Sequence, residues 1–124
     1  MKKYQITLTE EQLVLIAQSI EDVQRFASGQ MEMNNTLLKL LLGTKKAERY
    51  IQAEEKLQEL KPILFPDLNP NASLSYNGNN YVGNLYQIYR TMYYVLNKDG
   101  GVMNVYSSPA LPSGNMGTIE IKEL

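Results

Sequence analysis

The sequence predicts an α+β domain of four helices and a small antiparallel sheet, in the order β-α-α-α-α-β-β. Long segments with apolar residues at helical spacing fill the middle of the chain, and short alternating segments stand near both ends. With 124 residues, of which 44% are hydrophobic, the chain has the size and composition of one globular domain. We therefore expect residues 1–124 to form a single ligand-binding domain.

Three short strands are expected to form the sheet. Tyr4, Ile6 and Leu8 alternate with polar residues, as in a strand with one buried face. Residues 103–107 and 118–122 form the second and third segments, and a loop rich in proline, serine and glycine separates them. We expect the terminal strands to pair in one antiparallel sheet.

The first helix is expected to begin after Thr9, because Thr9 and Gln12 have the spacing of a capping box. Val14, Leu15 and Phe26 lie outside its expected core stripe, so a neighbouring helix or a partner chain has to cover them. The residues of the core stripe recur at helical spacing: Leu13, Ile16, Ala17, Ile20, Val23 and Ala27.

Three further helices are expected over residues 31–42, 45–61 and 83–97. The first of these is apolar nearly all round towards its end, which predicts deep burial or a place in an interface. The second carries many charges on a solvated face and should end before Pro62, which cannot donate a backbone hydrogen bond.

The composition excludes several classes of function. The chain has no histidine and no cysteine, so it lacks the usual general base near neutral pH, a thiolate nucleophile and the commonest transition-metal ligands. We therefore expect no enzyme activity, no metal and no cofactor. A net charge of −1 argues against duplex nucleic acid, although a few arginines suffice for a small anion. The apolar runs are too short for a membrane span, which predicts a cytoplasmic protein.

The segment 69–94 has the composition of a binding surface. It holds six of the eleven asparagines and six of the nine tyrosines in the chain. Tyr76, Asn80 and Tyr81 surround an Asn-Gly turn signal, and we expect them to cover a ligand with rings and amide groups. The alternative is a plain turn, because asparagine tolerates turn conformations.

Two arginines are candidates for binding a phosphate group. Arg90 lies four residues after Tyr86 and four before Tyr94, on one flank of the last expected helix. Arg25 stands just before a helix break, but it also lies four residues after Glu21, a spacing that favours an ordinary ion pair. A surface salt bridge remains the alternative for both arginines. Asn104 and Ser107 complete the candidate set, on the second expected strand.

Three segments of the chain, residues 4–13, 25–30 and 104–108, together carry a resemblance to known proteins. They resemble small proteins carried by bacteriophages and prophages. Within that set the chain is similar to the phage anti-Thoeris sponge proteins, which sequester cyclic ADP-ribose signals made by bacterial immune enzymes. The resemblance extends from Tyr4 to the last expected strand.

This resemblance implies sequestration without chemistry, in the cytoplasm of an infected bacterial host. Members of the family are symmetric oligomers whose pockets lie at or near subunit boundaries, and some also hold cyclic oligonucleotides. The resemblance implies a ligand-binding role for Arg25, and for Asn104 and Ser107. The chain departs from an arginine-lined pocket because it has just three arginines. The alternative function is a phage inhibitor that binds a host protein through an apolar helical face.

Overall fold

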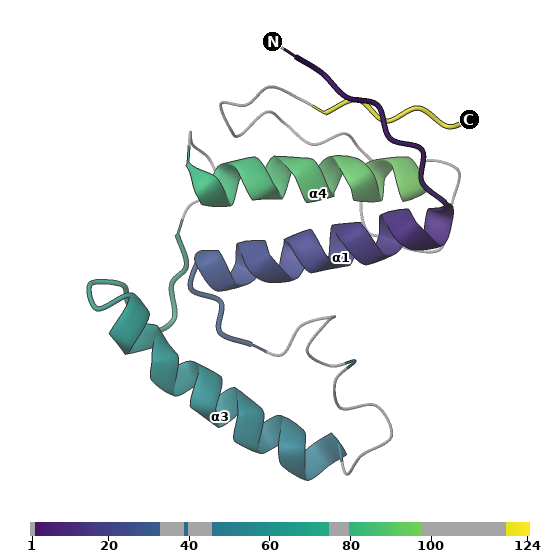
Figure 1. Ribbon diagram of the computed structural model, residues 1–124. Helices are drawn as coiled ribbons and strands as arrows, with labels where there is room; N and C mark the ends of the chain where they lie inside the picture. The colour runs from purple at the N-terminus through teal and green to yellow at the C-terminus, as the bar shows by residue number, and fades with distance from the viewer. Residues whose placement is uncertain (1, 33–38, 40–45, 75–79, 98–118) are drawn as a thin grey trace.

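The structure is a computed structural model that describes residues 2–32, 39, 46–74, 80–97 and 119–124. Its helices are α1 (Glu10–Ala27), α3 (Lys46–Leu64) and α4 (Tyr81–Asn97). Helices α1 and α4 pack against each other and run in opposite directions, while α3 extends away from them on the α1 side (Figure 1). The two terminal segments lie on the α4 side of the pair.

The predicted α+β class is wrong, because the described residues form helices and contain no strand or sheet. Residues 4–8 and 119–122 have no regular secondary structure. Tyr4 and Ile6 are 81% and 75% exposed, so their alternation does not define a buried face. The expected strand at 103–107 lies outside the described residues.

Helix α1 begins where its cap predicts. The Thr9 hydroxyl accepts a hydrogen bond from the Gln12 amide at 3.1 Å, and the Gln12 side chain accepts one from the Thr9 amide at 3.0 Å. This reciprocal pair satisfies two amides that have no partner inside the helix. The helix is followed by Gly29 with a φ of 94°, a conformation that favours glycine.

The ends of the other helices differ from the prediction by a few residues. Helix α3 passes through Pro62 and ends at Leu64, because a proline this close to the end removes only one helical hydrogen bond. Helix α4 begins at Tyr81 instead of residue 83, and it ends at Asn97 as predicted. Most of the helix expected over 31–42 lies outside the described residues.

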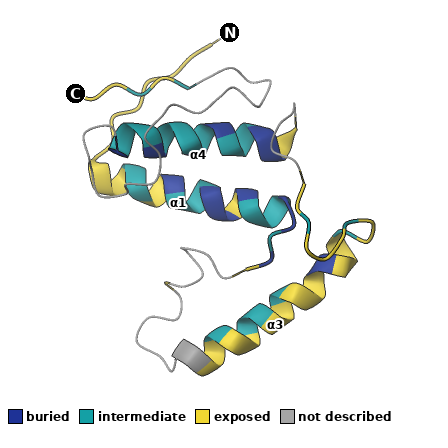
Figure 2. Cartoon of the chain, turned by 180° about the vertical axis from the view of Figure 1, so that it is seen from behind, coloured by how far each residue is buried: buried dark blue, intermediate teal, exposed yellow. Residues whose placement is uncertain are grey.

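The core is formed between α1 and α4. Ala17 packs with Tyr89 and Tyr93, and partly buried apolar side chains surround them: Ile20, Tyr86, Met92 and Leu96. Figure 2 shows buried positions on both helices of this pair, whereas α3 is mostly exposed.

The predicted core stripe of α1 is partly wrong. Ala17 is fully buried, but Ile16 and Val23 are 37% and 48% exposed. The polar residues Glu21 and Gln24 are buried in their place. Burial of these polar groups requires hydrogen-bond partners, and one partner comes from α4, as described below.

Candidate functional site

Arg25 lies in the last turn of α1 and is oriented by two neighbours. Its Nη2 lies 3.2 Å from Glu21 Oε2 in an ion pair. Its Nη1 donates a hydrogen bond of 3.1 Å to Gln30 Oε1, beyond the helix end. The Arg25 side chain is 36% exposed, whereas that of Glu21 is 11% exposed. The guanidinium group is therefore held at the surface by a carboxylate that is largely buried.

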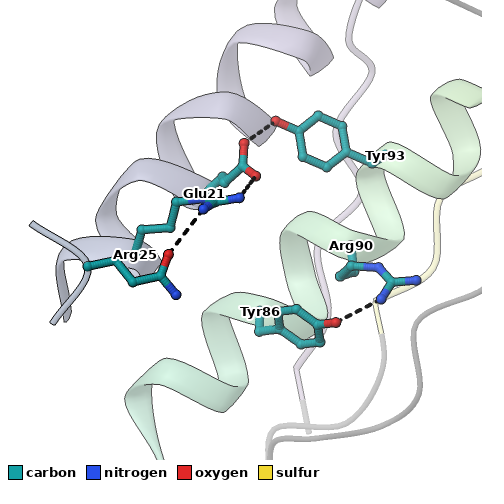
Figure 3. A network of polar contacts seen from close by, with 6 residues as sticks. Glu21, Arg25, Tyr86, Arg90 and Tyr93 are labelled. Carbon is teal, nitrogen blue, oxygen red and sulfur yellow. Dashed lines mark hydrogen bonds and ion pairs between the residues drawn. The ribbon is translucent and has the colours of Figure 1, made fainter. Parts of the chain in front are cut away.

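Tyr93 connects this ion pair to the other helix. Its hydroxyl donates a hydrogen bond of 2.9 Å to Glu21 Oε1 across the α1–α4 interface (Figure 3). Tyr93 is only 1% exposed. A buried carboxylate is costly unless it is paired and hydrogen-bonded, and Glu21 has both kinds of partner here. The arrangement fixes Glu21, and Glu21 in turn orients Arg25.

Tyr93 was not predicted as a site residue. The only signal in the sequence is its spacing of four residues from Tyr89, which places both rings on one face of a helix. A buried tyrosine hydroxyl usually has a hydrogen-bond partner. That this partner is Glu21 follows only from the antiparallel packing of the two helices.

Arg90 and Tyr86 are in contact, as their spacing predicts. Arg90 Nη1 donates to the Tyr86 hydroxyl at 2.7 Å, and Arg90 Cζ lies 5.6 Å from the centre of the Tyr86 ring. The Tyr86 ring packs edge-to-face against Tyr89 with centroids 5.5 Å apart, and Tyr89 packs similarly against Tyr93 at 5.8 Å. Arg90 therefore contacts the first of three tyrosine rings that pack edge-to-face, and the other two rings belong to the core.

Among the described residues, the two arginines bind different groups. Arg25 is bound to groups on α1 and on the turn after it, whereas Arg90 is bound to α4. Figure 3 shows their guanidinium groups directed at different partners and not at each other.

Asn80 has a structural role at the start of α4. Its Oδ1 accepts a hydrogen bond from the Gly83 amide at 2.7 Å, and its carbonyl oxygen accepts from the Asn84 amide at 3.0 Å. These bonds make Asn80 the N-cap of the helix. Tyr81 follows it and is 62% exposed, so its ring is available at the surface.

Three predicted site residues, Tyr76, Asn104 and Ser107, lie outside the described residues. Their proposed roles stay predictions, as does the expectation that the segment around Tyr76 covers a ligand.

Two hollows on the described surface are lined by residues other than the predicted site residues. One lies on α3, around Arg49 and Lys56. The other is a polar cavity near the end of α1, and Gln30, which binds Arg25, is part of its lining. The sequence gives no periodic signal for this cavity, because its lining comes from three separate segments.

An apolar face remains exposed on α1. Leu15 is 54% exposed, and it lies with the exposed Ile16 and Val23 on a common side of the helix. Val14 and Phe26, which were predicted to lie on a second face, are half-buried. The apolar surface of α1 is therefore larger than the contact with α4 covers.

The described residues contain no group of three or more carboxylates placed to hold a metal ion. None of the helices in the described part is long and apolar enough to cross a membrane. No protein-family model matches the chain, and comparisons with curated proteins and with solved structures found no match either.

Proposed function

We propose that this protein binds a small anionic nucleotide of the cyclic ADP-ribose type and sequesters it without cleaving it. The proposal includes a phage origin, action in the cytoplasm of the infected bacterium, and assembly into a homo-oligomer. It rests on the resemblance carried by residues 4–13, 25–30 and 104–108. Cyclic oligonucleotides belong to the same ligand class.

The observation that carries the proposal is the state of Arg25. Its guanidinium group is partly exposed and is oriented by Glu21 and Gln30. Arginine binds phosphate through paired N–H donors, and a side chain ordered in advance loses less conformational entropy when it binds. Arg25 also stands in the segment that carries the resemblance.

Sequestration without chemistry is supported by the residue types in the chain. The sequence contains no histidine or cysteine, so a proton acceptor near neutral pH and a thiolate nucleophile are both missing. A bound nucleotide should therefore be recovered unchanged.

The experiment is calorimetric titration of cyclic ADP-ribose into the wild-type protein and into Arg25→Ala, Arg25→Lys and Arg49→Ala. Loss of an arginine–phosphate contact should weaken binding by about 30- to 1,000-fold in Arg25→Ala. Arg25→Lys keeps the charge next to Glu21 and should weaken binding less. Arg49 is an exposed arginine on α3, and its replacement makes the same change in charge away from Arg25.

Two results would refute the proposal. One is equal affinity in the wild type and in Arg25→Ala. The other is a nucleotide that is released by heat with an altered mass, which would indicate an enzyme. Circular dichroism of each variant checks that the helices remain folded.

The second candidate function is the binding of a host protein through α1. The exposed Leu15, Ile16 and Val23 favour it, because contiguous apolar surface often marks an interaction site. A protein of this kind would show no change in melting temperature with nucleotide and a change only with its target.

A further inference from the structure

A polar cavity of about 400 Å³ lies where the end of α1, the last turns of α3 and the loop before α4 meet. Its volume is in the range typical of small-molecule sites. Its lining comes from three segments, residues 29–32, Gln58 with Lys61, and residues 70–73.

Hydrogen bonds hold these three segments together. Gln58 Nε2 donates to the carbonyl oxygen of Met31 at 2.7 Å, which ties α3 to the chain after α1. The Leu74 amide donates to the carbonyl oxygen of Ser28 at 2.7 Å, which ties the loop to the end of α1. The walls of the cavity are therefore fixed before any ligand enters.

Lys61 places a buried positive charge in the wall of this cavity. It is only 7% exposed. Its Nζ donates to the carbonyl oxygens of Pro70 and Ala72 at 2.7 and 2.6 Å. Both acceptors are neutral, and neither ion pair among the described residues involves Lys61.

Burial of an ammonium group is unfavourable unless an opposite charge compensates it. Two carbonyl dipoles compensate part of the charge and use two of the three N–H donors of the group. Glu32 is the one carboxylate in the lining, and it is exposed and not ion-paired with Lys61. An anion in the cavity would supply the missing negative charge.

We infer that this cavity is a binding site for a phosphate group and that Lys61 is its cationic ligand. The site is separate from Arg25, which does not line it, although Gln30 borders both. The phosphate group is either free inorganic phosphate or part of a nucleotide. The inference does not require the nucleotide function proposed above.

The test uses inorganic phosphate as the probe, on the full chain, with chloride at matched ionic strength as the reference. Phosphate raises melting temperatures more than chloride does even without a site, because it is excluded from protein surfaces. Binding at the site should add a further rise that is reduced in a variant with a weakened site, because a ligand that binds only the folded state stabilises it. Asn71→Asp is the decisive variant. It places a carboxylate in the lining while it leaves the carbonyl partners of Lys61 unchanged.

Asn71→Asp should lower the affinity for phosphate by about tenfold or more, because the new carboxylate repels phosphate and compensates Lys61. Gln52→Glu is the matched control: it makes the same change in charge on the exposed face of α3 and should bind phosphate as the wild type does. Lys61→Met should abolish phosphate binding if the variant folds. It also removes the hydrogen bonds to the carbonyl oxygens of Pro70 and Ala72.

The inference is overturned if phosphate stabilises the wild type no more than chloride does, or if Asn71→Asp binds phosphate as tightly as Gln52→Glu. The two charge variants identify the source of the phosphate group. Cyclic ADP-ribose binding that is weaker in Asn71→Asp than in Gln52→Glu assigns the site to the nucleotide, and equal nucleotide binding in the two variants assigns it to free phosphate. Nucleotide binding that depends on Arg25, together with no phosphate effect, would leave the proposed function standing while this inference fails.

Discussion

At the scale of single residues, the role of Arg25 depends on what lies across the helix interface. Its spacing from Glu21 predicts an ordinary ion pair, and that pair is present. The same carboxylate accepts a hydrogen bond from buried Tyr93. An exposed ion pair contributes little to stability, but a buried hydrogen bond to a charged group contributes more.

Tyr93→Phe should therefore destabilise the protein by roughly 1–3 kcal/mol, because it leaves Glu21 without its donor from α4. Urea denaturation followed by circular dichroism measures this change. Tyr94→Phe removes the same group from the next residue, which is half-buried, and should change the unfolding free energy by less than about 0.5 kcal/mol. A loss below about 0.5 kcal/mol in Tyr93→Phe would show that the bond between Tyr93 and Glu21 does not stabilise the fold.

Tyr50 should titrate at a higher pH than an ordinary tyrosine. Its hydroxyl donates a hydrogen bond of 2.9 Å to Glu54, and this bond is the main reason why the pKa of Tyr50 is raised above 10.0. A group whose pKa is higher in the folded state than in the unfolded state stabilises the fold at pH values below its unfolded pKa. The stabilisation is lost as the pH rises through the raised pKa.

Glu54→Gln should lower the pKa of Tyr50 towards 10.0, because it removes the negative charge that opposes ionisation. A pH titration through 10.0 and above, followed by carbon-13 NMR of the tyrosine ring carbons, measures the pKa of Tyr50 in the wild type and in the variant. Glu55→Gln, on the neighbouring exposed residue, is the control. A pKa of Tyr50 that is unchanged in Glu54→Gln would contradict the assignment.

At the scale of elements, local signals locate the start of α1 and the end of α4, but they misplace the end of α3 and the start of α4 by a few residues. The capping box at Thr9 and Gln12 and the cap at Asn80 both act within one turn of the chain. The face that each helix buries is less well predicted, because α1 carries apolar residues on most of its faces. Exposed Val23 and buried Glu21 show that packing against α4 selected a different face from the most apolar one.

The turn after α1 should not tolerate a side chain at Gly29. Its φ of 94° is unfavourable for other residues, and a Cβ atom there would lie 2.9 Å from Leu68 Cδ2. Gly29→Ala should therefore cost about 1–2 kcal/mol or more of unfolding free energy. Chemical denaturation measures the loss.

A double-mutant cycle with Leu68→Ala separates the two causes. The double variant should recover the steric part of the loss and keep the part due to φ. Additive losses would show that the contact with Leu68 does not contribute.

At the scale of the whole molecule, the described fold leaves apolar side chains uncovered on more than one helix. Leu15 and Val23 are exposed on α1, and Ile51 and Ile63 are exposed on α3. A hydrogen bond from Gln58 joins α3 to the chain after α1, and the hydrogen bonds of Lys61 join α3 to the loop that follows it. An assembly of several chains would cover part of this surface.

The protein should therefore be an oligomer at tens of micromolar, with α1 in the interface. Sedimentation velocity of the wild type and of Leu15→Glu measures this. Leu15→Glu should dissociate the assembly, because it would place a buried, unpaired carboxylate in the interface. Ile51→Glu on α3 makes a similar change at a residue that is 57% exposed and should leave an α1 interface intact. A monomeric wild type at this concentration would refute the prediction.

The sequence by itself determined the features that depend on a few neighbouring residues. These are the start of α1 at its capping box, the end of α4 at Asn97, the contact between Arg90 and Tyr86, and the ion pair between Arg25 and Glu21. Each arises within a segment of four or five residues, so spacing is sufficient to predict it.

The tertiary structure alone decided which features come together. The alternation of Tyr4 and Ile6 did not make a strand, because a strand also requires a neighbour to pair with and a face to bury. The bond between Tyr93 and Glu21 spans 72 positions, and the cavity of Lys61 joins three segments. Such contacts depend on how the helices pack, and that packing follows from the burial of the whole chain and not from any local pattern.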